Sequence, residues 1–177
     1  NIDIVLYNSD IKVTTAHVEM LSNCGHITIA EKKKIINGLK KVNKLADTGK
    51  LDWSVEYEDV HMNIENALVA LIGDVGKKIH LGRSRNDLVT TDLRLYLRDF
   101  IDIYLDKIRE IQHVLAKSAA QHSSSLFPGF THMQVAQPVT FGHHLLAWSE
   151  MLYRDELRLT NTRELLNTMP LGSAALS

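Results

Sequence analysis

Apolar residues recur at helical spacing over most of the chain, and the longest such stretch runs from Asp87 to about Ser123. No glycine or proline interrupts it. Its apolar positions alternate steps of four and three residues, the heptad pattern of helices that pack along one another: Leu97, Ile101, Tyr104, Ile108, Ile111 and Leu115. At 1.5 Å per residue this helix is about 50 Å long, so it needs an equally long neighbour.

The expected neighbour is a second long helix from about Pro138 to Leu166. Proline suits the first turn of a helix because its missing N–H has no partner there in any case. The apolar positions keep the same register: Phe141, Leu145, Trp148, Leu152, Leu159 and Leu166. One chain of this size does not cover two such seams, which predicts self-association.

Three shorter helices are expected before the long ones, each preceded by a polar residue that can cap it. Their expected bounds are Asn8 or Ser9 to Ser22, Thr28 to Leu45, and Ser54 to Gly73. Thr28 and Glu31 have the spacing of a capping box, in which each side chain binds the other residue's backbone N–H.

The fold class that follows is all-α. No stretch alternates polar and apolar residues between turn residues, so the sequence predicts no sheet. We expect two domains divided near Gly82: a helical N-terminal domain over residues 1–82, truncated at its start, and the first part of a long-helix bundle over residues 83–177. Asn1 stands in place of an initiator Met and residues 170–177 read as a loop, so we expect a piece of a longer chain.

Composition and charge narrow the class of protein. Twenty basic and 21 acidic side chains leave a net charge of −1, without the basic excess typical of nucleic-acid or membrane-surface binding, so neither partner is expected. The apolar runs fall short of the ~20 residues that a membrane span needs. A single cysteine, Cys24, excludes an intrachain disulfide and a cysteine-rich metal cluster, and is in keeping with a cytoplasmic protein.

Two polar segments each precede a long apolar-periodic stretch. They read Gly-Arg-Ser-Arg-Asn-Asp at 82–87 and Thr-His-Met-Gln-Val-Ala-Gln-Pro at 131–138. The first N–H groups of a helix lack partners and carry partial positive charge, so polar side chains beside them form a pocket for carboxylates or phosphates. Two such segments predict a substrate with two anionic groups, and the candidate binding residues are Ser84, Arg85, Asn86 and Thr131.

His132 is the candidate acid–base residue. Histidine titrates nearest neutral pH, and this one follows Thr131 in a predicted loop instead of lying on an apolar helix face. A surface or structural role is the alternative for a loop histidine. Helix capping alone also accounts for Ser84 and Asn86, and Arg85 alternatively serves as a surface charge.

A competing pattern points to a metal. Residues 58–61 and 110–113 both read Glu-x-x-His, the spacing used by four-helix di-iron carboxylate proteins. Glu110 and His113 fall on the side of the long helix opposite its apolar seam, where they face away from any metal inside the bundle. We therefore expect no metal and keep the di-iron bundle as an alternative. A plain coiled-coil scaffold leaves both polar segments unexplained.

The polar segments resemble the signatures of argininosuccinate lyase and the related delta-crystallins, in the fumarase–aspartase superfamily. Residues 76–87 with 91–95 resemble the first signature, and residues 128–144 the second; residues 58–61 with Glu65 fit the preceding helix. The resemblance spans essentially the whole chain. It implies part of the long-helix bundle that is typical of the superfamily.

The resemblance implies a cytoplasmic enzyme that splits argininosuccinate reversibly into arginine and fumarate without a cofactor. Asn86 and Thr131 match substrate-binding positions of the family, with Ser84 and Arg85 as companions, and His132 matches its acid–base histidine. The family is tetrameric, and each active site draws its signatures from different chains. The implied partners are therefore the small-molecule substrate and further copies of the chain.

Several positions depart from the family pattern. Leu81 stands where Thr is usual, Leu88 where Gln is usual, Met133 where Leu is usual, and Val135 where Arg is common. The Gly-Ser-Ser-x-Met-Pro loop with the partner serine is missing, as is the glycine-rich N-terminal substrate loop. The chain alone is therefore expected to be inactive, and a catalytically inactive crystallin-like relative is an alternative.

Overall fold

The computed structural model describes residues 2–174, which form two compact units. One holds the chain up to Tyr96 together with the segment from Thr168, and the other holds Leu97–Asn167. The last three residues of the predicted C-terminal loop, 175–177, lie outside the described part of the chain.

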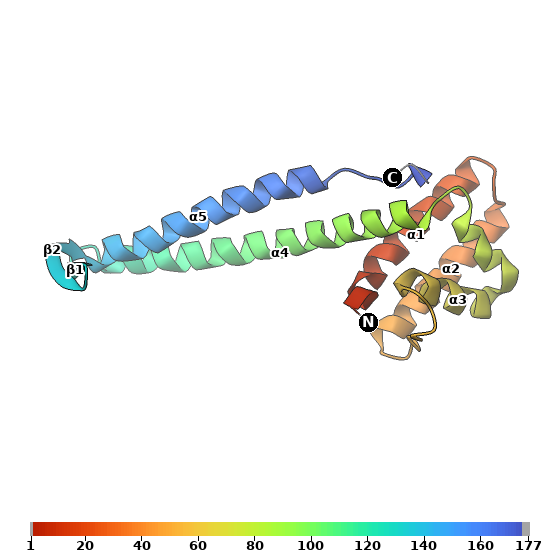
Figure 1. Cartoon of the computed structure of the whole chain (residues 1–177), viewed down its shortest axis with the longest axis horizontal. Coiled ribbons are helices and arrows are strands. Elements are labelled where there is room, and N and C mark those ends of the chain that lie inside the picture. The colour runs from red at the N-terminus through yellow and green to blue at the C-terminus, as the bar shows by residue number, and fades with distance from the viewer. Residues whose placement is uncertain (1, 175–177) are drawn as a thin grey trace. The chain divides into compact units, whose positions relative to one another are not determined.

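The first unit is helical throughout. A 3-10 helix, Ile2–Leu6, leads into α1 (Tyr7–Asn23), α2 (Ile29–Asp47) and α3 (Val60–Ile72), followed by a second 3-10 helix, Gly73–His80, and the start of α4 (Arg85–Gln121). Helices α1, α2 and α3 contact one another (Figure 1). The all-α prediction is thereby confirmed for this unit.

The helix starts show which predicted caps form. Thr28 and Glu31 make the predicted capping box: Glu31 N donates to Thr28 Oγ1 at 3.2 Å, and Thr28 N donates to Glu31 Oε2 at 2.9 Å. The predicted cap at Asn8 or Ser9 is wrong, because the 3-10 helix runs directly into α1. The predicted cap at Ser54 is also wrong, because α3 begins only at Val60, where Asp59 accepts a hydrogen bond from the N–H of Met62.

The core of this unit lies between α1, α2 and α3. The side chains of Val18, Ile35, Leu39, Ile64 and Leu68 are completely buried. Helices α2 and α3 approach closely at Gly38, where an added Cβ would lie 2.5 Å from Leu68 Cδ1. A residue larger than glycine would therefore require the end of the buried Leu68 side chain to shift.

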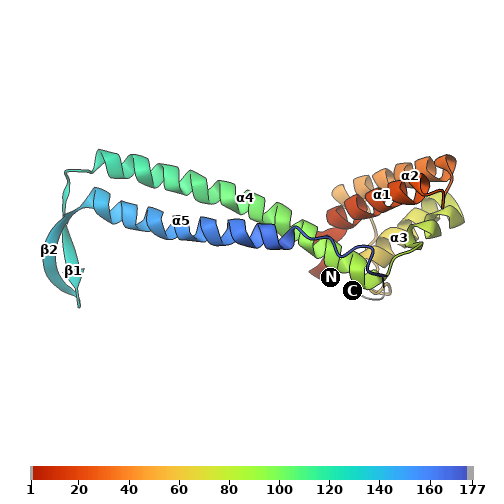
Figure 2. The same cartoon turned by 90° about the horizontal axis from the view of Figure 1, so that it is seen from above.

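In the second unit, α4 from Leu97 onwards lies antiparallel to α5 (Phe141–Leu166), side by side in both views (Figures 1 and 2). Polar contacts record the direction. Asp102 accepts two hydrogen bonds from Arg163, at 2.6 and 3.0 Å, and Arg109 donates to Glu156 at 2.8 Å. Residues with higher numbers on α4 pair with residues with lower numbers on α5, as expected for antiparallel helices. The predicted pair of long helices is thereby confirmed.

The predicted apolar seams are only partly buried in this pair. Ile101 is buried as predicted, whereas Tyr104 and Ile111 on α4 and Trp148 on α5 are about half exposed. One neighbouring helix buries only part of the apolar face of a helix. Apolar side chains outside that contact therefore stay exposed to solvent.

A β-hairpin joins the two long helices, and the prediction of no sheet is wrong here. Strands β1 (Leu126–Thr131) and β2 (Gln134–Thr140) are antiparallel, with a bulge between Pro128 and Phe130. Pro138 lies in β2, so α5 begins three residues later than predicted. The strands are short and contain two prolines, which obscures the usual alternation of polar and apolar residues.

Among the described helices, none combines the length and apolar character needed to cross a lipid bilayer. The helical class of the fold is confirmed, with the hairpin as its exception. The division of the protein into two domains near Gly82 stays a prediction. The two units of the structure are groups of residues in mutual contact, and they are divided after Tyr96.

Candidate functional site

The first polar segment opens α4, as predicted. Ser84 Oγ accepts a hydrogen bond from the N–H of Asn86 at 3.2 Å, and Asp87 Oδ1 accepts one from the N–H of Ser84 at 3.1 Å. These reciprocal contacts make Ser84 the cap of the helix. Asn86 is exposed beside it. The segment therefore presents an amide side chain at a helix start, where anionic groups are favoured.

Arg85 is held by two carboxylates at the start of α3. Its Nη1 donates to Glu58 Oε2 at 2.5 Å, and its Nε lies 2.9 Å from Asp59 Oδ2. Because Asp59 also caps α3, this ion pair ties the starts of α3 and α4 together. Asp59 was not among the predicted site residues, although its place before a helical stretch was a signal for a cap.

Asp87 is a second residue that sequence reasoning missed. Its buried carboxylate accepts hydrogen bonds from the N–H groups of Gly172 and Ala174, at 3.2 and 2.9 Å. Thr91, one turn further along α4, accepts one from the N–H of Leu171 at 3.0 Å. The start of α4 therefore anchors the backbone that follows α5. No local pattern indicates contacts between positions so far apart in sequence.

Charged side chains are buried behind the start of α4. Arg83 donates to Thr14 Oγ1 at 3.1 Å, and burial lowers the pKa of its guanidinium. Asp92 is 1% exposed; burial, followed by the negative charge of Asp10, raises the pKa of its carboxyl to about 9. In the described structure, Asp92 Oδ1 and two guanidinium nitrogens of Arg83 are buried without a hydrogen-bond partner. Keeping these groups buried costs stability.

We expect Asp92→Asn to stabilise the protein increasingly as pH rises. Folding raises the pKa of Asp92 from 3.8 to about 9, so the folded chain keeps a proton that the unfolded chain releases. The stability of the parent therefore falls between about pH 4 and pH 9. The variant does not lose stability in this way, because the amide of Asn does not titrate. Since one pKa unit is worth about 1.4 kcal/mol, the difference in unfolding free energy should grow by at least about 1 kcal/mol from pH 5 to pH 8. Urea titrations at both pH values measure it, and a pH-independent difference would contradict the buried, protonated Asp92.

The second polar segment forms the tip of the hairpin and does not open a helix, so that part of the prediction is wrong. Thr131 pairs with Gln134, and His132 and Met133 form the two-residue turn between them. Both turn residues have positive φ, 48° and 65°. Non-glycine residues rarely adopt this conformation, and strained positions of this kind gather at functional sites. Helix α5 is instead capped by Thr140.

The predicted site residues thus fall into two groups. Ser84, Arg85 and Asn86 are neighbours at the start of α4 in the first unit, and Thr131 and His132 are neighbours at the hairpin turn in the second. The side chains of Thr131 and His132 are exposed. Their roles in catalysis and binding stay predictions.

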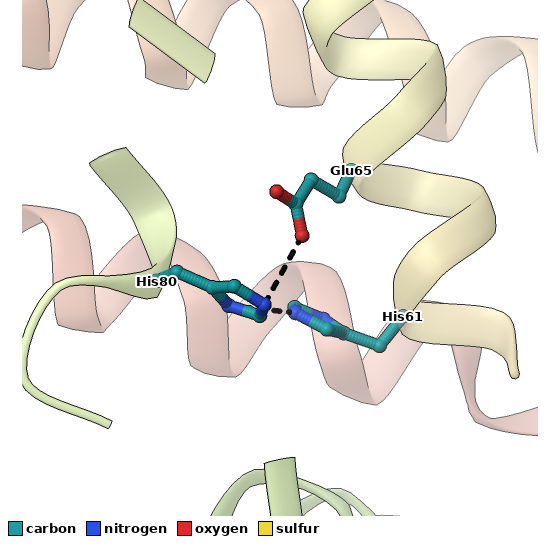
Figure 3. A group of neighbouring side chains, drawn as sticks. All are labelled: His61, Glu65 and His80. Atoms are coloured by element: carbon teal, nitrogen blue, oxygen red, sulfur yellow. Dashed lines mark hydrogen bonds and ion pairs between the residues drawn. The ribbon is translucent and has the colours of Figure 1, made fainter. Parts of the chain in front are cut away.

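The two Glu-x-x-His patterns do not form a dinuclear centre. Glu58 pairs with Arg85, and Glu110 pairs with Lys107 on the surface of α4. Within the described residues, the group of side chains placed to share a metal ion joins His61 to Glu65 and His80 (Figure 3).

A helical chain with polar segments at the start of α4 and at the hairpin has the features of a helical lyase, and the comparison with known families agrees. The family model described as lyase matches residues 1–177. The chain therefore belongs to this lyase family, which confirms the resemblance and argues against the di-iron alternative.

The chain is also similar to particular proteins. It is 54% identical over 172 residues to the argininosuccinate lyase of Azotobacter vinelandii and 52% identical over 172 residues to that of Hydrogenovibrio crunogenus; both matches cover 97% of this chain and 37% of the relative. A crystal structure of EDDS lyase in complex with formate superposes with a TM-score of 0.84 at 34% identity, over 97% of this chain and 33% of that one. The chain thus spans a little over a third of the length of the curated relatives it matches.

Proposed function

We propose that this chain is part of an argininosuccinate lyase, which eliminates arginine from argininosuccinate to leave fumarate, and does so reversibly. The observation that carries the proposal is the identity of 52–54% to argininosuccinate lyases over 97% of the chain. Both polar segments predicted to bind the substrate lie within this match. A fumarate-bound variant of EDDS lyase, at 34% identity, supports fumarate as the unsaturated product.

The residues suit the chemistry of this elimination. A base removes a proton beside a carboxylate, the negative charge spreads into that carboxylate, and an acid protonates the departing guanidinium nitrogen. Fixed hydrogen-bond donors at the developing charge contribute most to such a step. We assign binding of the substrate to Ser84, Arg85, Asn86 and Thr131, and acid–base transfer to His132. No cofactor enters this scheme.

The support differs among these residues. Asn86 is exposed at a capped helix start, and His132 is exposed on a strained turn, so both are accessible to a substrate. Arg85 already binds Glu58 and Asp59. We therefore expect Arg85 to contribute through its position at the start of α4 as well as through its charge.

We further propose that the whole protein is a cytoplasmic homotetramer. Its support is the exposed apolar surface of the two long helices, where the side chains of Ile103, Val114 and Leu165 are each at least 60% exposed. Apolar side chains left exposed along two long helices favour an interface with further copies of the chain. The single, exposed thiol of Cys24 is in keeping with a reducing compartment.

The test is an assay of the full-length protein with purified substrates. We expect argininosuccinate to yield fumarate and arginine in equal amounts, measured by the ultraviolet absorbance of fumarate and by chromatography of arginine. EDDS serves as the competing substrate, because a structural relative acts on it. Fumarate from EDDS and none from argininosuccinate would overturn the assignment, and no turnover of either would favour the inactive crystallin-like alternative.

A further inference from the structure

Three side chains of types that bind metals form a cluster in the first unit, and none of them is among the residues assigned to the substrate. His61 and Glu65 lie one turn apart on α3, and His80 reaches them from the end of the 3-10 helix that follows (Figure 3). One ligand atom from each residue lies within 4.8 Å of the other two. His61 Nε2 is 3.4 Å from His80 Nδ1, and His80 Nε2 is 3.3 Å from Glu65 Oε2.

The spacing of these atoms fits a bound ion. Zinc–nitrogen bonds of about 2.0–2.1 Å at tetrahedral angles place two ligand atoms about 3.3 Å apart. The separation of His61 and His80 is close to this value before any ion is present. His80 faces His61 with its Nδ1 and Glu65 with its Nε2, and the site uses one of these two nitrogens as its ligand.

Asp10 orients His61 from behind. Its Oδ2 lies 2.9 Å from His61 Nδ1, and both side chains are completely buried. A carboxylate in this position holds the proton on Nδ1 and leaves the lone pair on Nε2, on the side of His80. Metal-binding histidines usually donate their second N–H to a carboxylate, a backbone carbonyl or a water, which fixes the ring and makes it a stronger ligand. Thr14 donates a hydrogen bond to Asp10 and so holds it in turn.

The hydrogen bonds within the cluster are short of one proton. With Asp10 fixing the tautomer of His61, both neighbours of the His80 ring are acceptors: His61 Nε2 on one side and the Glu65 carboxylate on the other. A neutral His80 carries one N–H and can satisfy only one of them.

We propose that His61, Glu65 and His80 bind a single divalent transition-metal ion of the zinc class. A donor set of two imidazoles and one carboxylate binds ions of the zinc class better than it binds magnesium or calcium. The ion replaces the missing proton, since all three groups then face a cation. Glu65 and Asp10 supply negative charge. Of the two nearby guanidinium groups, Arg85 is paired with Glu58 and Asp59, and Arg83 donates to Thr14. The side chain of His80 is 46% exposed, which leaves a path for the ion and room for a water as fourth ligand.

This site goes beyond the proposed function, which uses no metal, and its test does not depend on activity. Full-length protein is first dialysed against a chelator and then titrated with Zn²⁺ by calorimetry, with Mg²⁺ as a comparison ion. We expect a single zinc ion per chain and no heat with Mg²⁺. Cobalt in place of zinc should give the intense visible absorption of a tetrahedral site.

Two variants and one control make the assignment specific. His80→Asn and Glu65→Gln each remove a ligand, and we expect at least about tenfold weaker zinc binding, since even partners of ligands contribute about 10- to 100-fold. Both residues are partly exposed, so the variants should fold, which circular dichroism checks. His113→Asn removes an exposed histidine from the other Glu-x-x-His pattern and should leave the affinity unchanged. Equal zinc binding by parent and His80→Asn, or none by the parent at about 100 µM zinc, would overturn the proposal.

Discussion

Replacing His132 by Asn in the full-length enzyme is expected to lower kcat by about 100-fold or more. Losing a positioned acid or base usually costs 10²- to 10⁴-fold. Asn has no group that transfers a proton near neutral pH, but it is among the few residues that tolerate the positive φ of 48° at this position. The hairpin turn should therefore persist in the variant. KM should change less than kcat, because substrate binding is assigned to other residues.

Steady-state kinetics with argininosuccinate measure this effect. The matched control is His113→Asn, which makes the same substitution at an exposed position on α4 and should leave kcat within about twofold of the parent, as is usual for surface changes. Near-parental turnover by the His132 variant would contradict the acid–base role and favour a structural one. A loss of similar size in the control would instead point to a general effect of removing histidines.

The 177-residue chain by itself should fold in part but form no fumarate from argininosuccinate. Its helices have caps and packed faces, such as Thr28 at α2 and the core around Leu68, so circular dichroism should show mainly helix. The serine-bearing loop of the family is not in the chain. Without that loop, the proposed site lacks the serine that the resemblance pairs with His132 and the closure that excludes water.

Mixing the short chain with a full-length variant tests whether activity returns when the missing loop is supplied by another chain. If active sites combine segments from different chains, refolding this chain together with a full-length His132→Asn variant should restore fumarate formation, because intact His132 then meets the loop of the other chain. The control is the same mixture made with the His132→Asn form of the short chain, which should stay inactive. Turnover by the short chain alone would refute the need for the loop. A mixture that forms mixed oligomers but no fumarate would refute the sharing of sites.

Local signals located the helices but misplaced the starts of α1, α3 and α5, and the roles of the candidate residues stay predictions. The capping box at Thr28 and the start of α4 at the Ser84 segment depend on residues three or four positions apart, which a sequence displays directly. The hairpin was missed because its strands contain Pro128 and Pro138 and its turn has His and Met where Asn and Gly are usual. The true cap of α3, Asp59, was missed because several polar residues precede that helix.

By itself, then, the sequence determined the helical class, the capping box at Thr28, the start of α4, the two polar segments and the resemblance to a lyase family. These depend on periodicity and short motifs, which neighbouring residues impose on the backbone. Only the tertiary structure decided that Asp87 holds residues 172 and 174, that Arg85 pairs with Glu58 and Asp59, and that His61 lies between Asp10 and His80. The physical reason is that these contacts join positions from about 20 to nearly 90 residues apart, so they exist only once the packing of the helices has brought the buried polar groups together.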